Sequence, residues 1–348
     1  MARFLSFLKR WMLPVAMIAG ALLYLAYRYA FPALHPYGKL LAALVKGIQP
    51  ILIFAMLFIS FSCIKPSQIR PHRWQFRLLG IQALVFVGAA LIDLFGTAPG
   101  STGALALECL MICAICPTAA AAPVFTARMG GDIASLVSYV VLANLLTSVL
   151  VPLFVPLLHP SVDVSFWSAS GMMLTKVFPL LIGPFLMAWL VRCLFPSFHR
   201  KVVENAWASF YVWSFSLMLA ILMSVRFLMG STAGGLVFGV LAAVSFLCCL
   251  ANFVIGRVVG LHEGRAARRP DEQGSPAGTG LEVPAGTEGN VVVSVTQSMG
   301  QKNTVFSIWM GYTFFTPVTS ITGGFYSIWQ NLINSWQLEQ KRKNENNL

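Results

Sequence analysis

Long apolar runs recur along the whole chain and give the first prediction. Several exceed the roughly 20 residues that a helix needs to cross the hydrocarbon core of a bilayer. Backbone polar groups inside lipid must be satisfied within the span itself, so these runs predict transmembrane α-helices. We therefore predict an all-α polytopic membrane protein with ten transmembrane helices, at residues 12–31, 40–62, 78–96, 103–127, 133–158, 171–194, 207–228, 233–257, 289–312 and 314–335.

One long stretch between the eighth and ninth spans has no apolar run. Residues 261–288 read LHEGRAARRPDEQGSPAGTGLEVPAGTE, which is rich in Gly, Pro and charged residues. Such a composition is typical of segments that cannot bury enough apolar surface to fold by themselves. We expect a flexible cytoplasmic loop here.

Composition excludes a water-soluble globule. Hydrophobic residues make up 57% of the chain and charged residues only 10%. Soluble domains contain about 25% charged residues. The protein must therefore be surrounded by lipid over much of its surface.

The net charge of +12 is compatible with a nucleic-acid partner, but the distribution of the basic residues argues against one. Eighteen of the 24 Lys and Arg residues fall in connections and ends on one side of the predicted spans, and three fall on the other side. This bias predicts that the rich side, with both termini, is cytoplasmic. We expect a multi-pass protein of the cell (inner) membrane, in contact with lipid and with no nucleic acid.

Two of the predicted spans contain breaks. The fourth carries Pro117 and Pro123, each of which removes a backbone donor and pushes against the carbonyl four residues back. The ninth has a polar centre, TQSMGQKNT, in which Gly300 is the expected break. An interrupted helix in the middle of a membrane is tolerated only where it is buried in protein or lines a wet cavity.

The two breaks lie five spans apart. Because five is odd, two halves of five helices each would run through the membrane in opposite directions. This predicts two inverted five-helix repeats, residues 1–158 and 159–348. Interrupted spans at matching positions of such halves indicate the binding site of a transporter.

Lys302 is the main candidate for a functional residue, because it lies about midway along the ninth span. An ammonium at the bilayer centre costs about 3 kcal/mol on insertion scales, so it needs a partner. Carbonyls freed near the prolines are expected partners, in either a structural or a functional role. Lys46 and Lys176 lie nearer the ends of their spans, where snorkelling explains them.

Small polar residues surround both breaks. Each of them could bond the unwound backbone or contact a solute. The candidates for substrate or ion binding, besides Lys302, are Asn303, Gln301, Ser298, Thr126 and Thr118.

Three of the seven cysteines share one helical face. Cys109, Cys113 and Cys116 follow i, i+4, i+7 spacing. Small-residue packing explains them, and so would a site for a soft metal or arsenite. The second explanation leaves an arsenite-type efflux permease open as an alternative, although the spacing lacks the paired cysteines of a zinc site and we predict no resident metal.

The chain shows no catalytic motif, and we expect no enzyme. Asp93 and Asp132 are the only candidates for the pair of an intramembrane protease, but the stretch before Asp132 lacks the first glycine of a GxGD motif. Asp132 is more simply explained as a helix start. A receptor without transport is a further alternative, for which only the 261–288 loop offers a signalling part.

Two short motifs follow a pattern found in one family. Their matching residues are Cys116 and Pro117, Val124 to Thr126, Gly131 and Asp132, and then Gly300 and Asn303 in the ninth span. They resemble the CPGG-x-x-SN-x-x-T, GD and E-x-G-x-QN stretches of the bile acid:sodium symporter family, which shares a superfamily with arsenite permeases and auxin carriers.

The resemblance implies a secondary transporter of small organic anions that works by alternating access. It implies a core domain, from spans 3–5 and 8–10, which moves against a panel domain, from spans 1, 2, 6 and 7. The sodium-binding positions depart from the family pattern. The family's Ser-Asn pair falls on Ala122 and Pro123, its Glu on Ser298 and its Gln on Lys302.

These departures predict that no intact sodium site, and no other cofactor, is present. Sodium needs oxygen ligands, which Ala and Pro side chains lack, and an ammonium repels it. We expect sodium-independent transport, with the Lys302 charge where relatives hold sodium. A buried ammonium can also release its proton, so Lys302 is in addition a candidate proton carrier.

Overall fold

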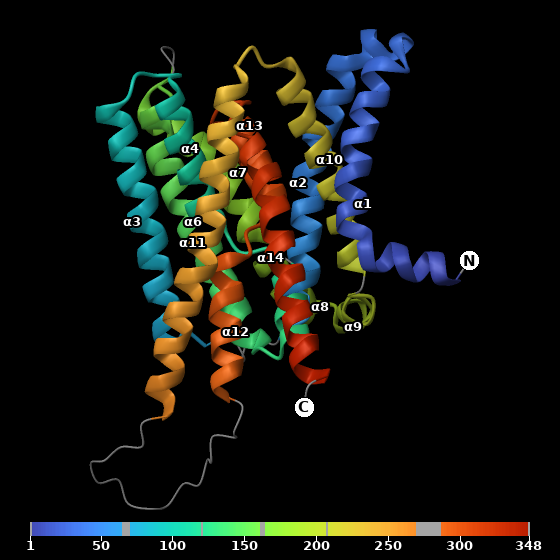
Figure 1. Cartoon of the computed structure of the whole chain (residues 1–348), viewed down its shortest axis with the longest axis vertical. Helices are drawn as coiled ribbons and strands as arrows, with labels where there is room; N and C mark the ends of the chain where they lie inside the picture. Colours follow the sequence, from blue (N-terminus) through green and yellow to red (C-terminus); the bar gives the residue numbers. More distant parts are fainter. Residues whose placement is uncertain are drawn as a thin grey trace, which may run out of the picture.

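The protein is a bundle of long α-helices whose axes run roughly in one direction (Figure 1). The computed structural model describes residues 2–64, 70–119, 121–160, 164–206, 208–268 and 287–346. Within these ranges every regular element is a helix, apart from one isolated β-bridge. The prediction of an all-α membrane fold is confirmed.

The chain up to the middle of the sequence forms six α-helices and one 3-10 helix. They are α1 (Ala2–Tyr29), η1 (Pro32–Tyr37), α2 (Gly38–Ser62), α3 (Arg73–Gly96), α4 (Thr102–Ile115), α5 (Ala122–Met129) and α6 (Ile133–Leu158).

The remainder of the described chain forms eight more. They are α7 (Phe166–Leu181), α8 (Gly183–Leu194), α9 (Pro196–Glu204), α10 (Ala208–Gly230), α11 (Gly235–Arg268), α12 (Thr287–Gly300), α13 (Thr304–Phe314) and α14 (Ile321–Asn346).

Several helices are individually long and apolar enough to cross a bilayer. In the described ranges there are five, Pro32–Ser62, Arg73–Gly96, Ile133–Leu158, Tyr211–Gly230 and Gly235–Arg265, and the bent pair α7 and α8 adds a sixth. The chain is therefore a multi-pass membrane protein. The predicted number of ten spans stays a prediction, because the fourth and ninth are divided into the shorter helices α4, α5, α12 and α13.

The predicted sixth span is also divided, which the sequence interpretation did not include. Helices α7 and α8 meet at Ile182 at an angle of 43°. Pro184 at the start of α8 has no N–H, and its ring clashes with the carbonyl of Leu180, so the helix cannot continue straight. Gly183 next to it favours the bend further.

The predicted cytoplasmic loop begins later than expected. Helix α11 continues to Arg268, so residues 261–268 are helical rather than loop. This segment contains good helix formers, and no proline follows until Pro270. Glu263 also pairs with Arg77 of α3, which ties the extension to the bundle. Residues 269–286 of the predicted loop lie outside the described residues.

The long helices contact one another in two groups. In the first, α3 to α6 and α11 to α14 are connected by mutual contacts. In the second, α1, α2, α7, α8 and α10 are connected. Contacts of α10 with α13 and α14, of α2 with α13, and of α6 with α7 join the two groups.

The packing of α11 on α12 is very close. A Cβ added at Gly256 would lie 2.9 Å from the Thr296 Cα, and one at Gly260 would lie 2.9 Å from the Val292 Cα. The two glycines are four residues apart and face the same neighbour. This is the small-residue spacing that lets membrane helices approach backbone to backbone, and it fixes α12, which leads into the second break.

Candidate binding site at the crossing of two broken helices

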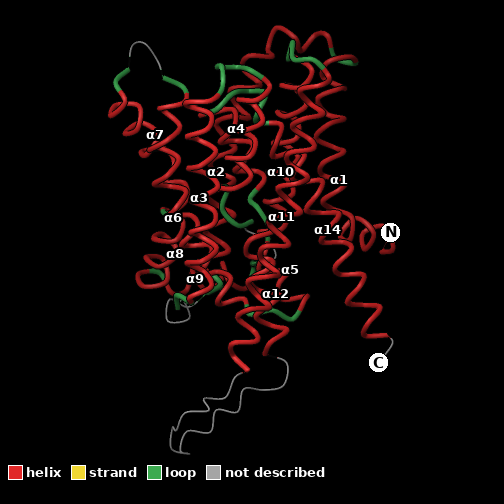
Figure 2. Tube along the Cα trace, turned by 60° about the vertical axis from the view of Figure 1, so that its left-hand side comes forward, coloured by secondary structure: helices red, strands yellow, loops and turns green. Residues whose placement is uncertain are grey.

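The two breaks meet inside the bundle, where Figure 2 shows them as loop segments surrounded by helices. Thr118 and Lys302 form an antiparallel β-bridge. On either side of it, Asn303 N donates to Pro117 O at 2.8 Å and Ala119 N donates to Gln301 O at 3.0 Å. Each unwound segment thus satisfies part of the backbone of the other.

Proline and glycine act differently at the two breaks. Helix α4 ends at Ile115, and Pro117 lies within the break that follows. Pro123 does not interrupt a helix but lies in the first turn of α5, where a missing N–H costs nothing. Helix α12 ends at Gly300, where a Cβ would lie 2.4 Å from the Phe253 ring, so only glycine fits there.

The last carbonyls of α4 would be unpaired in lipid, and side chains from other helices bind them. Asn252 Nδ2 of α11 donates to Cys113 O at 3.4 Å. Gln82 Nε2 of α3 donates to Ala114 O at 2.9 Å. Thr147 Oγ1 of α6 donates to Ile115 O at 2.8 Å. The break is therefore held by three neighbouring helices.

Lys302 occupies the centre of the crossing and is only 1% exposed. Its Nζ donates to Ala114 O at 3.1 Å, and its backbone N donates to Gln330 Oε1 at 3.0 Å. The ammonium thus lies at the C-terminal end of α4, where the helix dipole favours a cation. The ion pairs of the described residues do not include Lys302.

The second break is held in a similar way. Thr118 Oγ1 donates to Ser298 O at 2.7 Å, and Tyr326 OH donates to Gly300 O at 2.9 Å. Asn303 caps α13, because its Oδ1 accepts from Phe306 N at 3.1 Å. Of the predicted site residues, Thr118 and Asn303 thus use Oγ1 and Oδ1, respectively, to form hydrogen bonds with backbone groups.

Three other polar atoms of the predicted site have no hydrogen-bond partner in the described part of the chain. They are the hydroxyls of Ser298 and Thr126 and the amide nitrogen of Asn303, all buried. Gln301 differs, because its Nε2 donates to Gln297 Oε1 at 2.5 Å. A buried polar atom without a partner costs free energy, which a ligand can recover.

Several residues that hold the crossing were missed by the sequence interpretation. Besides Gln82 and Asn252, they include Tyr139, whose OH donates to Gln82 Oε1 at 2.7 Å. On α14, Tyr326 and Gln330 are buried and face the second break. The sequence contained a signal for them, since Tyr326, Gln330 and Asn334 recur every four residues and therefore share one face of the helix.

The other two lysines predicted within spans are not at the crossing. Lys46 is exposed on α2, with its Nζ 5.8 Å from the centre of the Phe227 ring and 5.4 Å from that of Tyr312. Lys176 is exposed on α7. Glu108 is buried, but it pairs with His159 at 3.2 Å rather than with Lys302.

The three aligned cysteines do not point to one centre. Cys116 Sγ donates to Asn303 O at 3.1 Å and Cys109 Sγ donates to Leu241 O at 3.6 Å. Among the described residues there is no group of three Cys, His, Asp or Glu side chains placed to hold a metal ion. The arrangement gives the arsenite alternative no geometric support.

The aspartyl pair of an intramembrane protease is contradicted. Asp132 caps α6, where its carboxylate accepts from Ala134 N at 2.9 Å and Ser135 N at 3.2 Å. Asp93 accepts a hydrogen bond from Thr97 at the C-terminal end of α3. The first finding confirms that Asp132 marks a helix start.

The fold and the crossing together show the class of protein. It is a polytopic helical membrane protein whose polar centre is formed by two interrupted helices. Comparison with known families then agrees with the resemblance inferred from the motifs. Residues 79–232, from α3 to the end of α10, match the model of the Sodium Bile acid symporter family. The family predicted from the motifs is thus confirmed over this segment, and the match supports a membrane transporter of the bile acid:sodium symporter type rather than an enzyme.

The matched segment includes the first break and ends before the second. A transporter of this family implies a small-molecule substrate and a lipid bilayer around the protein. No curated protein gives a significant sequence match to the chain.

Proposed function

We propose that the protein is a secondary active transporter that moves a small organic anion by alternating access without sodium. The observation that carries the proposal is the buried Lys302 ammonium at the crossing, bonded to Ala114 O. Its charge is balanced by helix and carbonyl dipoles rather than by a carboxylate in the described chain. Such a site gains from the arrival of a negative charge.

The unpartnered donors nearby fit the same class of substrate. Asn303 Nδ2 and the hydroxyls of Ser298 and Thr126 can donate to carboxylate or sulfonate oxygens. Hydrogen bonds to a charged acceptor are the stronger kind. Lys302, Asn303, Ser298 and Thr126 are therefore our proposed binding residues, with Thr118 and Gln301 holding the breaks.

The donor set does not suit a sodium ion. Ala122 and Pro123 offer no side-chain oxygen, and Ala114 O already accepts from both Lys302 Nζ and Gln82 Nε2. An ammonium so close would repel a second cation. These features support the absence of a sodium site and of coupling to sodium.

Ten spans in two inverted repeats, residues 1–158 and 159–348, form the proposed architecture. The two groups of helices in contact support a core of α3 to α6 and α11 to α14 and a panel of α1, α2, α7, α8 and α10. In the proposed mechanism the core, which carries Lys302, moves against the panel. Lys302 would then alternate between the two sides of the membrane.

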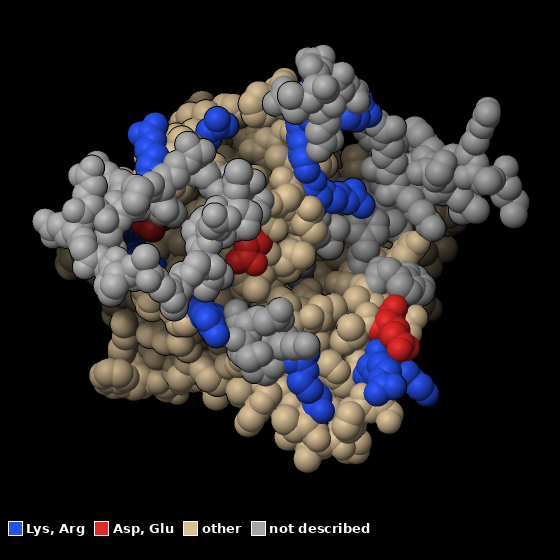
Figure 3. Space-filling view, turned by 90° about the horizontal axis from the view of Figure 1, so that it is seen from below, with Lys and Arg blue, Asp and Glu red and all other residues tan. Residues whose placement is uncertain are grey.

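The charge distribution supports cytoplasmic termini in the cell membrane. Figure 3 shows the end of the bundle that lies lowest in Figure 1, and Lys and Arg outnumber Asp and Glu on it. The C-terminal end of α14 lies at this same end. Positive charge is enriched on the cytoplasmic side of membrane proteins.

The sodium part of the proposal can be tested without knowing the substrate. A ligand that binds only the folded state stabilises it, by about 1.6 kcal/mol when its concentration is about 15 times the Kd. We expect the purified protein to melt at the same temperature in sodium chloride and in choline chloride. Stabilisation specific to sodium, or probe-anion uptake by proteoliposomes that requires sodium, would contradict the proposal.

The role of Lys302 can be tested by Lys302→Gln, with Lys176→Gln as a matched control. Lys176 is a lysine within a span that lies away from the crossing, so its loss should leave transport intact. In proteoliposomes with taurocholate and succinate as probe anions, Lys302→Gln should lose uptake and any response to a pH gradient. An unchanged gradient response in Lys302→Gln would exclude Lys302 as the proton carrier.

A further inference from the structure

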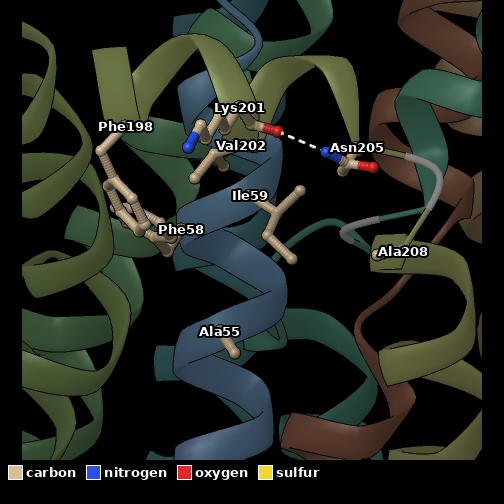
Figure 4. A pocket seen from close by; sticks show the side chains of 8 residues that line it. All are labelled: Ala55, Phe58, Ile59, Phe198, Lys201, Val202, Asn205 and Ala208. Carbon is tan, nitrogen blue, oxygen red and sulfur yellow. Dashed lines mark hydrogen bonds between the residues drawn. The ribbon is translucent and has the colours of Figure 1, made fainter. Parts of the chain in front are cut away.

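A hollow lies on the surface, away from the crossing, between α2, α9 and the start of α10. It has a volume of about 370 Å³, and its walls are almost entirely apolar. Figure 4 shows its lining side chains, which are Ala55, Phe58 and Ile59 of α2, Phe198, Lys201, Val202 and Asn205 from α9 and its end, and Ala208 of α10.

The short helix α9 forms one wall and is amphipathic. Phe198 and Val202 lie one turn apart and face α2, whereas Arg200 lies on another face of the helix. Figure 1 shows α9 end-on, so it runs crosswise to the long helices. A crosswise amphipathic helix with basic residues is the form that lies at a membrane surface.

This wall is fixed in place, so the hollow does not depend on a ligand for its shape. His199 Nε2 lies 3.0 Å from Ser62 O, at the last turn of α2. Arg192 Nη2 of α8 donates to the same oxygen at 3.0 Å. Arg192 Nε also donates to His199 Nε2 at 3.2 Å, so Arg192 connects α9 with the end of α2.

The chemistry of the hollow fits an amphiphile. Its polar groups are confined to Lys201 and Asn205, and Asn205 Nδ2 is already engaged with Lys201 O at 2.9 Å. This leaves one ammonium beside a carbon-lined space. A soluble anion would leave the apolar walls in contact with water, and a neutral chain would gain nothing from the charge of Lys201.

We propose that this hollow is a binding site for an anionic phospholipid. One acyl chain lies between Phe58 and Val202, and the phosphate pairs with Lys201. Basic side chains gather on the same end of the bundle (Figure 3), which adds attraction for anionic headgroups. The site is separate from the proposed transport pathway and does not depend on it.

The test is native mass spectrometry of the full chain in a mild detergent, with dioleoyl phosphatidylglycerol and dioleoyl phosphatidylcholine added separately. We expect tighter binding of phosphatidylglycerol. Lys201→Gln should weaken that binding about fivefold and leave phosphatidylcholine unaffected. Arg200→Gln removes the same charge from an exposed position outside the hollow and should change binding less than about twofold.

Filling the hollow tests the position of the acyl chain. Ala55→Phe and Ala208→Leu narrow the space from opposite walls, and both should reduce binding of both lipids. Circular dichroism and elution volume report whether each variant is folded. Glycerol phosphate and inorganic phosphate should not bind.

Four results would overturn the proposal. The first is equal binding of the two lipids, and the second is equal loss in Lys201→Gln and Arg200→Gln, which would indicate only a diffuse surface charge. The third is full binding by both folded filling variants, which would place the acyl chain elsewhere. Binding of free phosphate equal to that of the lipid would point to a soluble anion instead.

Discussion

Tyr326 of α14 and Tyr312 of α13 differ in whether their buried hydroxyl has a partner. Tyr326 OH donates to Gly300 O at 2.9 Å and accepts from Asn252 Nδ2 at 3.0 Å. Tyr312 OH is buried and has no hydrogen-bond partner in the described chain. The same chemical change at these two positions should therefore have different effects.

Removing the Tyr326 hydroxyl should destabilise the protein, whereas removing that of Tyr312 should not. Tyr326→Phe leaves Gly300 O and one Asn252 hydrogen unpaired, at a cost of about 1–3 kcal/mol in the free energy of unfolding. Tyr312→Phe replaces an unpaired hydroxyl and should be neutral or stabilising. Thermal denaturation of both variants in detergent gives the comparison. An equal loss in both would mean that the Gly300 bond contributes nothing.

Single residues were predictable from the sequence when their signal was local. Lys302 was found because a charge inside an apolar run is unusual wherever its partner lies. Its partner Ala114 could not be identified, since the two are 188 residues apart and an alanine carbonyl has no sequence signature. Gln330 could be recognised in the sequence as a polar residue within a span. Its role could not be predicted, because that depends on its facing the second break.

The approach of helices α11 and α12 depends on two glycines of α11. At Gly256 a Cβ would meet the backbone of Thr296 at 2.9 Å, and backbone cannot move aside as a flexible side chain can. Gly239, on the same helix, has no atom within 4 Å of its added Cβ. Comparing Gly256 with Gly239 therefore separates the effect of packing from that of helix propensity.

Gly256→Ala should destabilise the protein, and Gly239→Ala should not. The first substitution overpacks the α11–α12 contact and should cost about 1–3 kcal/mol. The second gains helix propensity of about 1 kcal/mol in open space. Melting temperatures in detergent check both. A Gly256→Ala protein as stable as Gly239→Ala would show that α12 can shift freely.

Helices and their breaks were predictable to different degrees. Long apolar runs located the helices, and Pro117 and Gly300 indicated two of the breaks. The bend at Ile182 was missed although Pro179 and Pro184 were visible, because the run from 171 to 194 is apolar enough to read as one straight span. Periodicity gives the length of an apolar run, whereas the bend depends on how α7 and α8 pack on other helices.

Contact between the two groups of helices includes a cluster of one cation and two rings. Lys46 of α2 lies near the rings of Phe227 on α10 and Tyr312 on α13. The centres of these two rings are 5.7 Å apart. Since α10 belongs to the proposed panel and α13 to the proposed core, the proposed motion requires this distance to change.

A crosslink between Phe227→Cys and Tyr312→Cys should therefore stop probe-anion uptake, and reduction should restore it. The control is Phe61→Cys with Phe185→Cys, which joins α2 and α8 within the panel across rings 5.6 Å apart. This second crosslink should leave uptake unchanged. Undiminished uptake with the first crosslink complete would argue against motion between core and panel.

Orientation in the membrane can be checked with a native thiol. Cys193 is exposed at the end of α8, which the proposed topology places on the cytoplasmic side. In a Cys63→Ser background, a membrane-impermeant maleimide should label Cys193 only after cells are permeabilised. Ala98→Cys, in the exposed α3–α4 connection, should react in intact cells. The reverse pattern would invert the topology.

The β-bridge between Thr118 and Lys302 also constrains how the protein can be synthesised. The hydrogen bonds around it join segments 180 to 188 residues apart, so the first break enters the membrane long before the second exists. Until then Pro117 O and Ala119 N have no backbone partner, which lipid does not tolerate. A nascent chain therefore has to keep the α4–α5 segment shielded from lipid, at the insertion machinery or near the headgroups, until α12 and α13 have been synthesised. The crossing should consequently form in a single step, only after the second break has been synthesised.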